Sequence, residues 1–134
     1  MAKKKKSWVE KRDCGKAPHV TVIHKAFAGI PAGSKLLISS PLEIDQFVRA
    51  VPKGRIIEPQ EMRRQLATRH QADATCPVST GIFLRIVAEA ALEEHKSGMD
   101  LSKIAPFWRV IKQGTPLAKK LSISGDELAG FVSH

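Results

Sequence analysis

The chain has few cysteines and no long apolar run, and both shortages exclude whole classes of protein. Two cysteines, Cys14 and Cys76, are too few for a disulfide framework or for a zinc site of four thiolates. No run of 18 apolar residues is present, and no apolar signal segment follows the charged start. The five histidines lack metal-ligand spacing. We therefore expect a protein of the reducing cytoplasm that binds no metal.

Positive charge is what the chain has in excess. Its 22 basic residues outnumber 13 acidic ones, giving a net charge of +9. This excess favours a polyanionic partner, because each phosphate contact releases counterions. Residues 1–16 hold seven of the basic residues against two acidic ones, and we expect them to form a flexible tail that adds phosphate contacts. Residues 17–134 are expected to form a single domain.

Local patterns predict a mixed α+β domain. Aliphatic and β-branched runs at 20–23 and 36–38, separated by glycine and proline, predict one or two short strands. Ser40, Pro41 and Glu43 are typical of a helix start, and an apolar stripe continues that helix to residue 51. Two more helices are expected at about 59–70 and 77–96. An extended segment at 108–111 would then complete a helix-turn-helix with a wing.

The third of these helices is the candidate for insertion into a DNA groove. Ser79, Thr80 and Gly81 are small and uncharged at its N-terminal end, where free backbone amides and the helix dipole favour phosphate. Glutamates in its C-terminal half would repel phosphate. The two hydroxyl residues would serve equally well as caps of a core helix. Its buried stripe is predicted to contain Ile82, Phe83, Ile86, Val87, Ala90 and Ala91.

Basic residues of the preceding helix would hold the phosphates on either side of that groove. Arg63, Arg64 and Arg69 concentrate three guanidinium groups on one short element, whose inward residues are predicted to be Met62, Leu66 and Ala67. Together with the lysines of the tail, these arginines make duplex DNA the expected partner.

Short segments along the chain resemble the DNA alkylguanine alkyltransferases and the alkyltransferase-like proteins. The run 51–56 resembles the turn after the first helix of their DNA-binding domain, and 106–111 resembles their Pro-Cys-His-Arg-Val active-site box. The lysines at 3–6 with Trp8, and the segment 76–83, resemble a bacterial group related to the alkyltransferases. The resemblance covers most of the chain. It implies a winged helix-turn-helix domain that binds duplex DNA without a cofactor. It also implies a location in the bacterial cytoplasm, which is compatible with association with the nucleoid.

The active-site box departs from the family at its two catalytic positions. Phe107 stands where the family has the cysteine that accepts the alkyl group, and Trp108 stands at the histidine. A phenyl ring has no lone pair, so alkyl transfer cannot occur there. The two rings would either form an open pocket that stacks on a base, worth roughly 1–3 kcal/mol, or pack inside the domain. Arg109 matches the family arginine, which implies that it supports the wing or the pocket.

The parts that the family uses to flip a base out of the duplex are also altered. The resemblance places Pro59 at the tyrosine that presses on a phosphate, and Gly81 near the arginine that fills the gap. Arg85 lies one turn further on and either replaces that arginine or pairs with Glu89. We therefore expect inefficient base flipping.

The sequence predicts DNA binding without alkyl transfer, with damaged duplex as the target that the resemblance implies. Two alternatives stay open. A methylated-DNA–protein-cysteine methyltransferase would use Cys76, whose thiolate a helix N-terminus would stabilise, with His70 as a nearby base. A small buried apolar cysteine is the structural alternative at that position. The other functional alternative is a protein-interaction module on the same fold.

Overall fold

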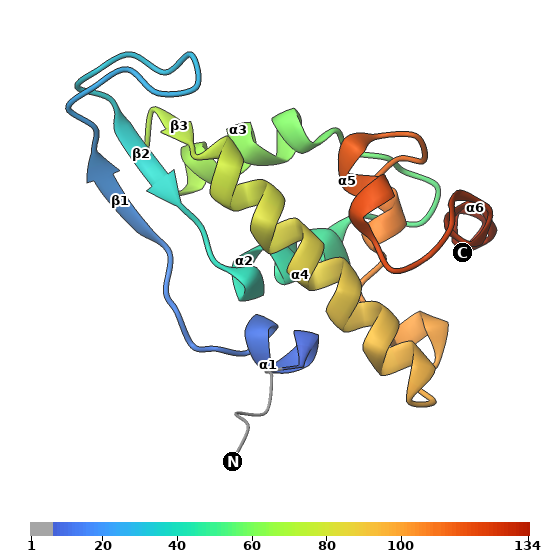
Figure 1. Cartoon of the computed structure of the whole chain (residues 1–134). Helices are drawn as coiled ribbons and strands as arrows, with labels where there is room; N and C mark the ends of the chain where they lie inside the picture. The colour runs from blue at the N-terminus through green and yellow to red at the C-terminus, as the bar shows by residue number, and fades with distance from the viewer. Residues whose placement is uncertain (1–6) are drawn as a thin grey trace.

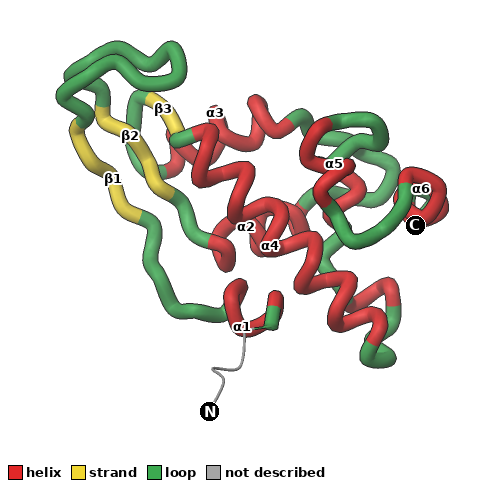
Figure 2. Tube along the Cα trace, viewed as in Figure 1, coloured by secondary structure: helices red, strands yellow, loops and turns green. Residues whose placement is uncertain are grey.

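The structure, a computed structural model, describes residues 7–134 and is a mixed α+β fold. The described part contains six α-helices, two 3₁₀ turns and a three-stranded sheet (Figure 1). The sheet lies at one side of the molecule, and the helices make up the rest (Figure 2). The lysines at 3–6 lie outside the described residues.

The sheet is small and is formed mainly by one hairpin. β1 (His19–Val22) pairs antiparallel with β2 (Lys35–Ile38), with His19 opposite Ile38. β3 (Ala74–Thr75) adds a short parallel edge to β2. Leu36 and Leu37 of β2 are buried, whereas all four residues of β1 are exposed. These strands confirm the two that the aliphatic runs predicted.

Three central helices begin where local capping signals predict. α2 (Pro41–Ala50) starts after Ser40, whose hydroxyl accepts the Glu43 amide at 3.1 Å. α3 (Pro59–Arg69) and α4 (Pro77–Lys96) also begin at a proline, whose missing N–H costs nothing at a first helical position. α3 is held to α2 through Glu43, which accepts Ser39 Oγ and contacts His70 Nε2, each at 2.6 Å.

The core forms where α4 crosses α2 in the middle of the molecule (Figure 1). The inward residues predicted for α3 are confirmed. The apolar stripe predicted for α2 is buried except at its first residue, Leu42, which is 37% exposed. On α4 the predicted stripe is wrong in part. Ile82 is 56% exposed, while Leu84 and Ala88 are fully buried. The core consists mainly of Leu37, Ile44, Val48, Met62, Leu66, Leu84, Val87, Ala88, Ala91, Phe107, Ile111 and Leu128.

Part of the expected N-terminal tail is instead an ordered helix. α1 (Trp8–Arg12) begins with a reciprocal capping box between Ser7 and Glu10. It packs against α4, and Arg12 is only 9% exposed because its guanidinium is paired with Glu94. The expectation of a flexible segment over 1–16 is therefore wrong for these residues. They are anchored by the ion pair between Arg12 and Glu94 and by two hydrogen bonds from α1 amides to Glu93, which the tail sequence does not reveal.

The segment after α4 forms turns and short helices. It contains the 3₁₀ turns η1 (Leu101–Lys103) and η2 (Phe107–Arg109), then α5 (Pro116–Lys120) and α6 (Gly125–Phe131). The extended segment expected at 108–111 is therefore wrong. Phe107, Trp108, Val110 and Ile111 are all buried, which an alternating strand on one side of a core does not allow. Within the described residues, no strand follows α4 to serve as the expected wing.

Candidate nucleic-acid interface

The N-terminal half of α4 presents a face that the rest of the fold leaves uncovered. Val78 and Ile82 are each 56% exposed. Gly81 lies between them, Arg85 lies one turn beyond Gly81, and both are half-buried. The spacing of three, four and seven residues places these four on one side of the helix. We call Val78, Gly81, Ile82 and Arg85 the α4 face. Apart from α4's own backbone, no described atom lies within 4 Å of a Cβ built at Gly81.

The hydroxyl residues that we expected at this interface are less available. Thr80 is only 2% exposed, and its hydroxyl donates to the Cys76 carbonyl at 2.6 Å. The prediction of Thr80 as a DNA contact is therefore wrong, because its side chain serves its own helix. Ser79 is half-buried, and its Oγ is a buried atom without a hydrogen-bond partner among the described residues.

The first turn of α4 retains the backbone donors of a helix N-terminus. The Thr80 amide makes the first intrahelical bond, to Cys76 at 3.1 Å. The preceding amides of Val78 and Ser79 therefore have no intrahelical acceptor. The Cys76 amide donates to Leu37 of β2 at 2.9 Å, which fixes the start of α4 against the sheet. The positive end of the dipole thus lies beside an exposed residue, Val78.

On one side, α3 supplies cations beside the start of α4. Gln60, Arg63 and Arg64 line a hollow that Pro77 of α4 also lines. Arg63 is half-buried, and the Arg64 side chain is 67% exposed. Arg64 donates from Nε to Glu61 at 2.8 Å, and this hydrogen bond is the main cause that lowers the Glu61 pKa to about 2. The structure therefore brings two of the three predicted α3 arginines near α4.

The third arginine, Arg69, lies elsewhere. Its guanidinium is 4.0 Å from Glu43 of α2, next to the contact between Glu43 and His70. Six residues advance a helix by roughly one and two-thirds turns, so Arg69 points away from Arg63. The sequence spacing already contained this information. The prediction that all three arginines form one cluster is wrong.

On the other side, α1 and α5 border the α4 face. A groove there is lined by Val78 and Ile82 together with Trp8, Lys11, Arg85, Pro116, Leu117 and Lys120. The Lys11 Nζ lies 4.3 Å from the centre of the Trp8 ring, and the Arg85 guanidinium lies 5.3 Å from it. Arg85 therefore lies beside Trp8 at this border. Sequence reasoning missed the roles of Trp8 and Lys120, because only the docking of α1 and α5 brings them here.

Of the two alternatives for Phe107 and Trp108, the structure shows the rings packed inside the domain. Phe107 is fully buried and Trp108 is 3% exposed. Their ring centres lie 5.2 Å apart, edge to face, and Trp108 stacks on Phe131 of α6 at 5.3 Å. The aromatic rings therefore form part of the core.

Arg109 is likewise occupied away from the α4 face. Its Nη1 donates to the Val51 carbonyl at 2.7 Å, and its Nη2 donates to the His134 carbonyl at 2.8 Å. These bonds connect η2 to the end of α2 and to the C-terminal residue. Both ends of its guanidinium therefore hold the fold, and Arg109 takes no part in the α4 face.

The cysteine of the enzyme alternative is placed poorly for attack on DNA. Cys76 is 6% exposed, and His70, the base considered for it, is instead bound to Glu43. Cys14 is exposed and lies between α1 and β1. Within residues 7–134, no group of three or more histidine, cysteine or acidic side chains is arranged to hold a metal ion.

Comparisons with protein-family models, with curated proteins and with solved structures find no match to this chain. None of the helices described is both long enough and apolar enough to cross a bilayer. The geometry of the α4 face therefore carries the functional argument.

Proposed function

We propose that this protein binds duplex DNA by inserting the N-terminal half of α4 into the major groove. In this proposal α3 and α4 act as a helix-turn-helix, as the resemblance to the alkyltransferases implies. One observation carries it. The exposed end of α4 is uncharged at Val78, Gly81 and Ile82, and it is flanked by cations on both sides.

The dimensions and chemistry of the α4 face suit a groove. A major groove about 12 Å wide admits an α-helix, and thymine methyl groups within it offer apolar contacts. Val78 and Ile82 supply such contacts, and Gly81 allows the backbone to approach closely. Arg63 and Arg64 then reach phosphates on one side of the groove, and Lys11 and Lys120 reach them on the other.

The binding is proposed to occur without alkyl transfer. Phe107, at the position of the family cysteine, is fully buried and has no nucleophilic atom. The other candidate thiol, at Cys76, is covered by its surroundings. Phe107 itself is enclosed by Trp108 and Phe131, so we propose that the protein recognises the duplex from its groove.

Fluorescence anisotropy with a labelled duplex tests this proposal. Ile82→Glu places a carboxylate at the centre of the α4 face and is expected to weaken binding by about tenfold or more. Val132→Glu is the matched control, because Val132 is 51% exposed and lies beyond α6. The wild-type affinity should fall as salt rises. Equal affinities for the two variants, or binding insensitive to salt, would rule the proposal out.

The exposed aliphatic residues also support a second candidate, a protein-interaction module. Val78 and Ile82 continue into the groove that Trp8, Ile86 and Leu117 line, and such apolar surface is typical of a protein contact. This candidate predicts that the protein has no affinity for duplex DNA at low salt. It also predicts that Ile82→Glu disrupts a complex, which sedimentation with the partner would detect.

A further inference from the structure

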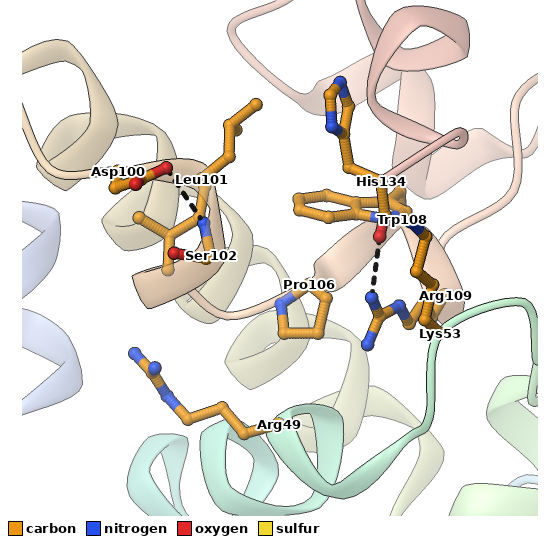
Figure 3. Close-up of a pocket in the computed structure, with 10 residues that line it drawn as sticks. Arg49, Lys53, Asp100, Leu101, Ser102, Pro106, Trp108, Arg109 and His134 are labelled. Atoms are coloured by element: carbon orange, nitrogen blue, oxygen red, sulfur yellow. Dashed lines mark hydrogen bonds between the residues drawn. The ribbon is translucent and has the colours of Figure 1, made fainter.

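A cavity of about 570 Å³ opens where the end of α2 meets η1 and η2 (Figure 3). Its walls include Arg49, Lys53, Asp100, Pro106, Trp108 and Arg109. None of these residues belongs to the α4 face or to the hollow and groove beside it. Its volume is in the range of small-molecule sites.

Three cations from separate segments line this cavity, together with the side-chain carboxylate of Asp100 and with His134, whose backbone oxygen accepts a hydrogen bond from Arg109. Arg49 is held in place by Asp45, which accepts its Nε at 2.8 Å, and by the Lys103 carbonyl, which accepts Nη1 at 2.8 Å. These two bonds leave the Nη2 group of Arg49 for a ligand. Lys53 lies in the exposed turn after α2. Such prearranged cations create a positive potential inside a partly enclosed space.

Two buried donors in this wall have no acceptor within the described residues. They are Nε1 of Trp108 and Nε of Arg109. A buried hydrogen-bond donor without an acceptor lowers the stability of a fold by about 1–3 kcal/mol, so each such group calls for a structural or functional explanation. Arg109 is already bound through Nη1 and Nη2, so it contributes mainly charge to the cavity. Trp108 borders the cavity and therefore reports on whatever enters it.

We propose that this cavity binds a small anion of the phosphate class. Arg49 lies on one side of Pro106, and Lys53 and Arg109 lie on the other (Figure 3). An anion with two charged groups, such as a diphosphate, reaches the cations on both sides. Phosphate oxygens accept charge-assisted hydrogen bonds from lysine and arginine, which are roughly twice as strong as neutral ones. The same chemistry is offered by a free small molecule and by the phosphates of a DNA strand.

Nuclear magnetic resonance of the two tryptophan indole N–H groups tests the proposal. Titration with inorganic pyrophosphate at constant ionic strength should shift the Trp108 signal saturably, and Trp8→Phe assigns the two signals. Lys53→Ala should weaken the affinity by about tenfold, since a hydrogen bond to a charged group is lost. Lys119→Ala removes the same charge from an exposed position on α5 outside the cavity, and should leave the affinity within about twofold.

A Trp108 signal that does not move, or equal weakening by the two lysine variants, would overturn the proposal. A parallel titration with a short duplex distinguishes the two sources of phosphate. A shift with pyrophosphate identifies a small-molecule site. A shift with duplex alone assigns the cavity to the DNA backbone and rejects the small ligand. Pyrophosphate binding does not require DNA binding, so failure of either proposal leaves the other standing.

Discussion

Arg12 of α1 donates two hydrogen bonds to Glu94 of α4, from Nη1 at 2.7 Å and from Nη2 at 3.3 Å. The neighbouring Glu93 accepts the backbone amides of Trp8 and Val9, at 3.1 and 3.4 Å. Two of the glutamates expected to repel phosphate are therefore used to hold α1. The charge of Glu94 is balanced by Arg12, Glu93 is bonded to backbone amides, and α1 carries Trp8 and Lys11 to the border of the α4 face.

Arg12→Ala is expected to lower the free energy of unfolding by about 1–3 kcal/mol, because it leaves a partly buried carboxylate without its partner. Urea denaturation measures this loss. Hydrogen exchange at the Trp8 and Val9 amides should accelerate in the same variant, because their acceptor lies on the neighbouring residue of α4. Lys16→Ala, at an exposed position, is the control. If the two variants are equally stable, α1 is not anchored by this pair.

The pKa of Glu61 should be about 2, mainly because of its hydrogen bond from Arg64. The folded protein favours the charged carboxylate. This contribution to stability is therefore complete above the ordinary pKa of 4.5, and it is lost as the pH falls toward 2. A carboxyl titration followed by nuclear magnetic resonance checks the value. Arg64→Ala should raise the pKa back toward 4.5, and an unchanged pKa in that variant would show that Arg64 does not cause the shift.

Glu61→Gln should strengthen binding to duplex DNA. Arg64 is held by Glu61 in the free protein, so removal of the carboxylate frees the guanidinium for a phosphate and removes a repulsive charge. Anisotropy should show an affinity about two- to fivefold higher at low salt, with the difference shrinking as salt rises. Glu127→Gln on α6 makes the same charge change away from α3 and from the α4 face. Equal gains in both variants would indicate a general charge effect.

Gly81→Ala should change the stability of the fold and the affinity for DNA in different directions. Its Cβ meets open space, and alanine is a better helix former than glycine by up to about 1 kcal/mol, so the unfolding free energy should stay level or rise. The added methyl group stands where the α4 face approaches DNA. We expect binding to weaken by about 1 kcal/mol, or about fivefold. Thermal denaturation and anisotropy on one sample would reveal the opposite signs.

The two thiols should differ sharply in reactivity toward iodoacetamide. Cys14 is exposed and should be alkylated first, whereas Cys76, at 6% exposure, should react mainly after unfolding. Mass spectrometry of peptides measures both. Incubation with methylated DNA should leave the mass of Cys76 unchanged. A methyl group found on Cys76 would restore the enzyme alternative.

The helix boundaries could be predicted because their causes are local. Ser40, Pro41 and Glu43 provide the cap, the first residue and the first-turn charge of α2 within four positions of the chain. The burial of Phe107 and Trp108 could not be predicted from local signals of this kind. Their enclosure depends on Phe131 of α6, more than twenty residues later, and no pattern near 107 indicates that contact.

The orientation of α4 also required the fold. The helix is apolar on nearly every side, so its periodicity did not distinguish Ile82 from Leu84, although one is 56% exposed and the other 1%. The side facing α2 became buried. The opposite side became the α4 face, because α1 and α5 border it without covering it.

By itself, the sequence determined the excess of positive charge, the starts of the main helices and the lack of a thiol at position 107. These are properties of composition and of a few adjacent residues. Only the tertiary structure decided which side of α4 is exposed, that the aromatic box is closed and that α1 is anchored. The physical reason is that each depends on contacts between residues distant in the chain, as between Arg12 and Glu94.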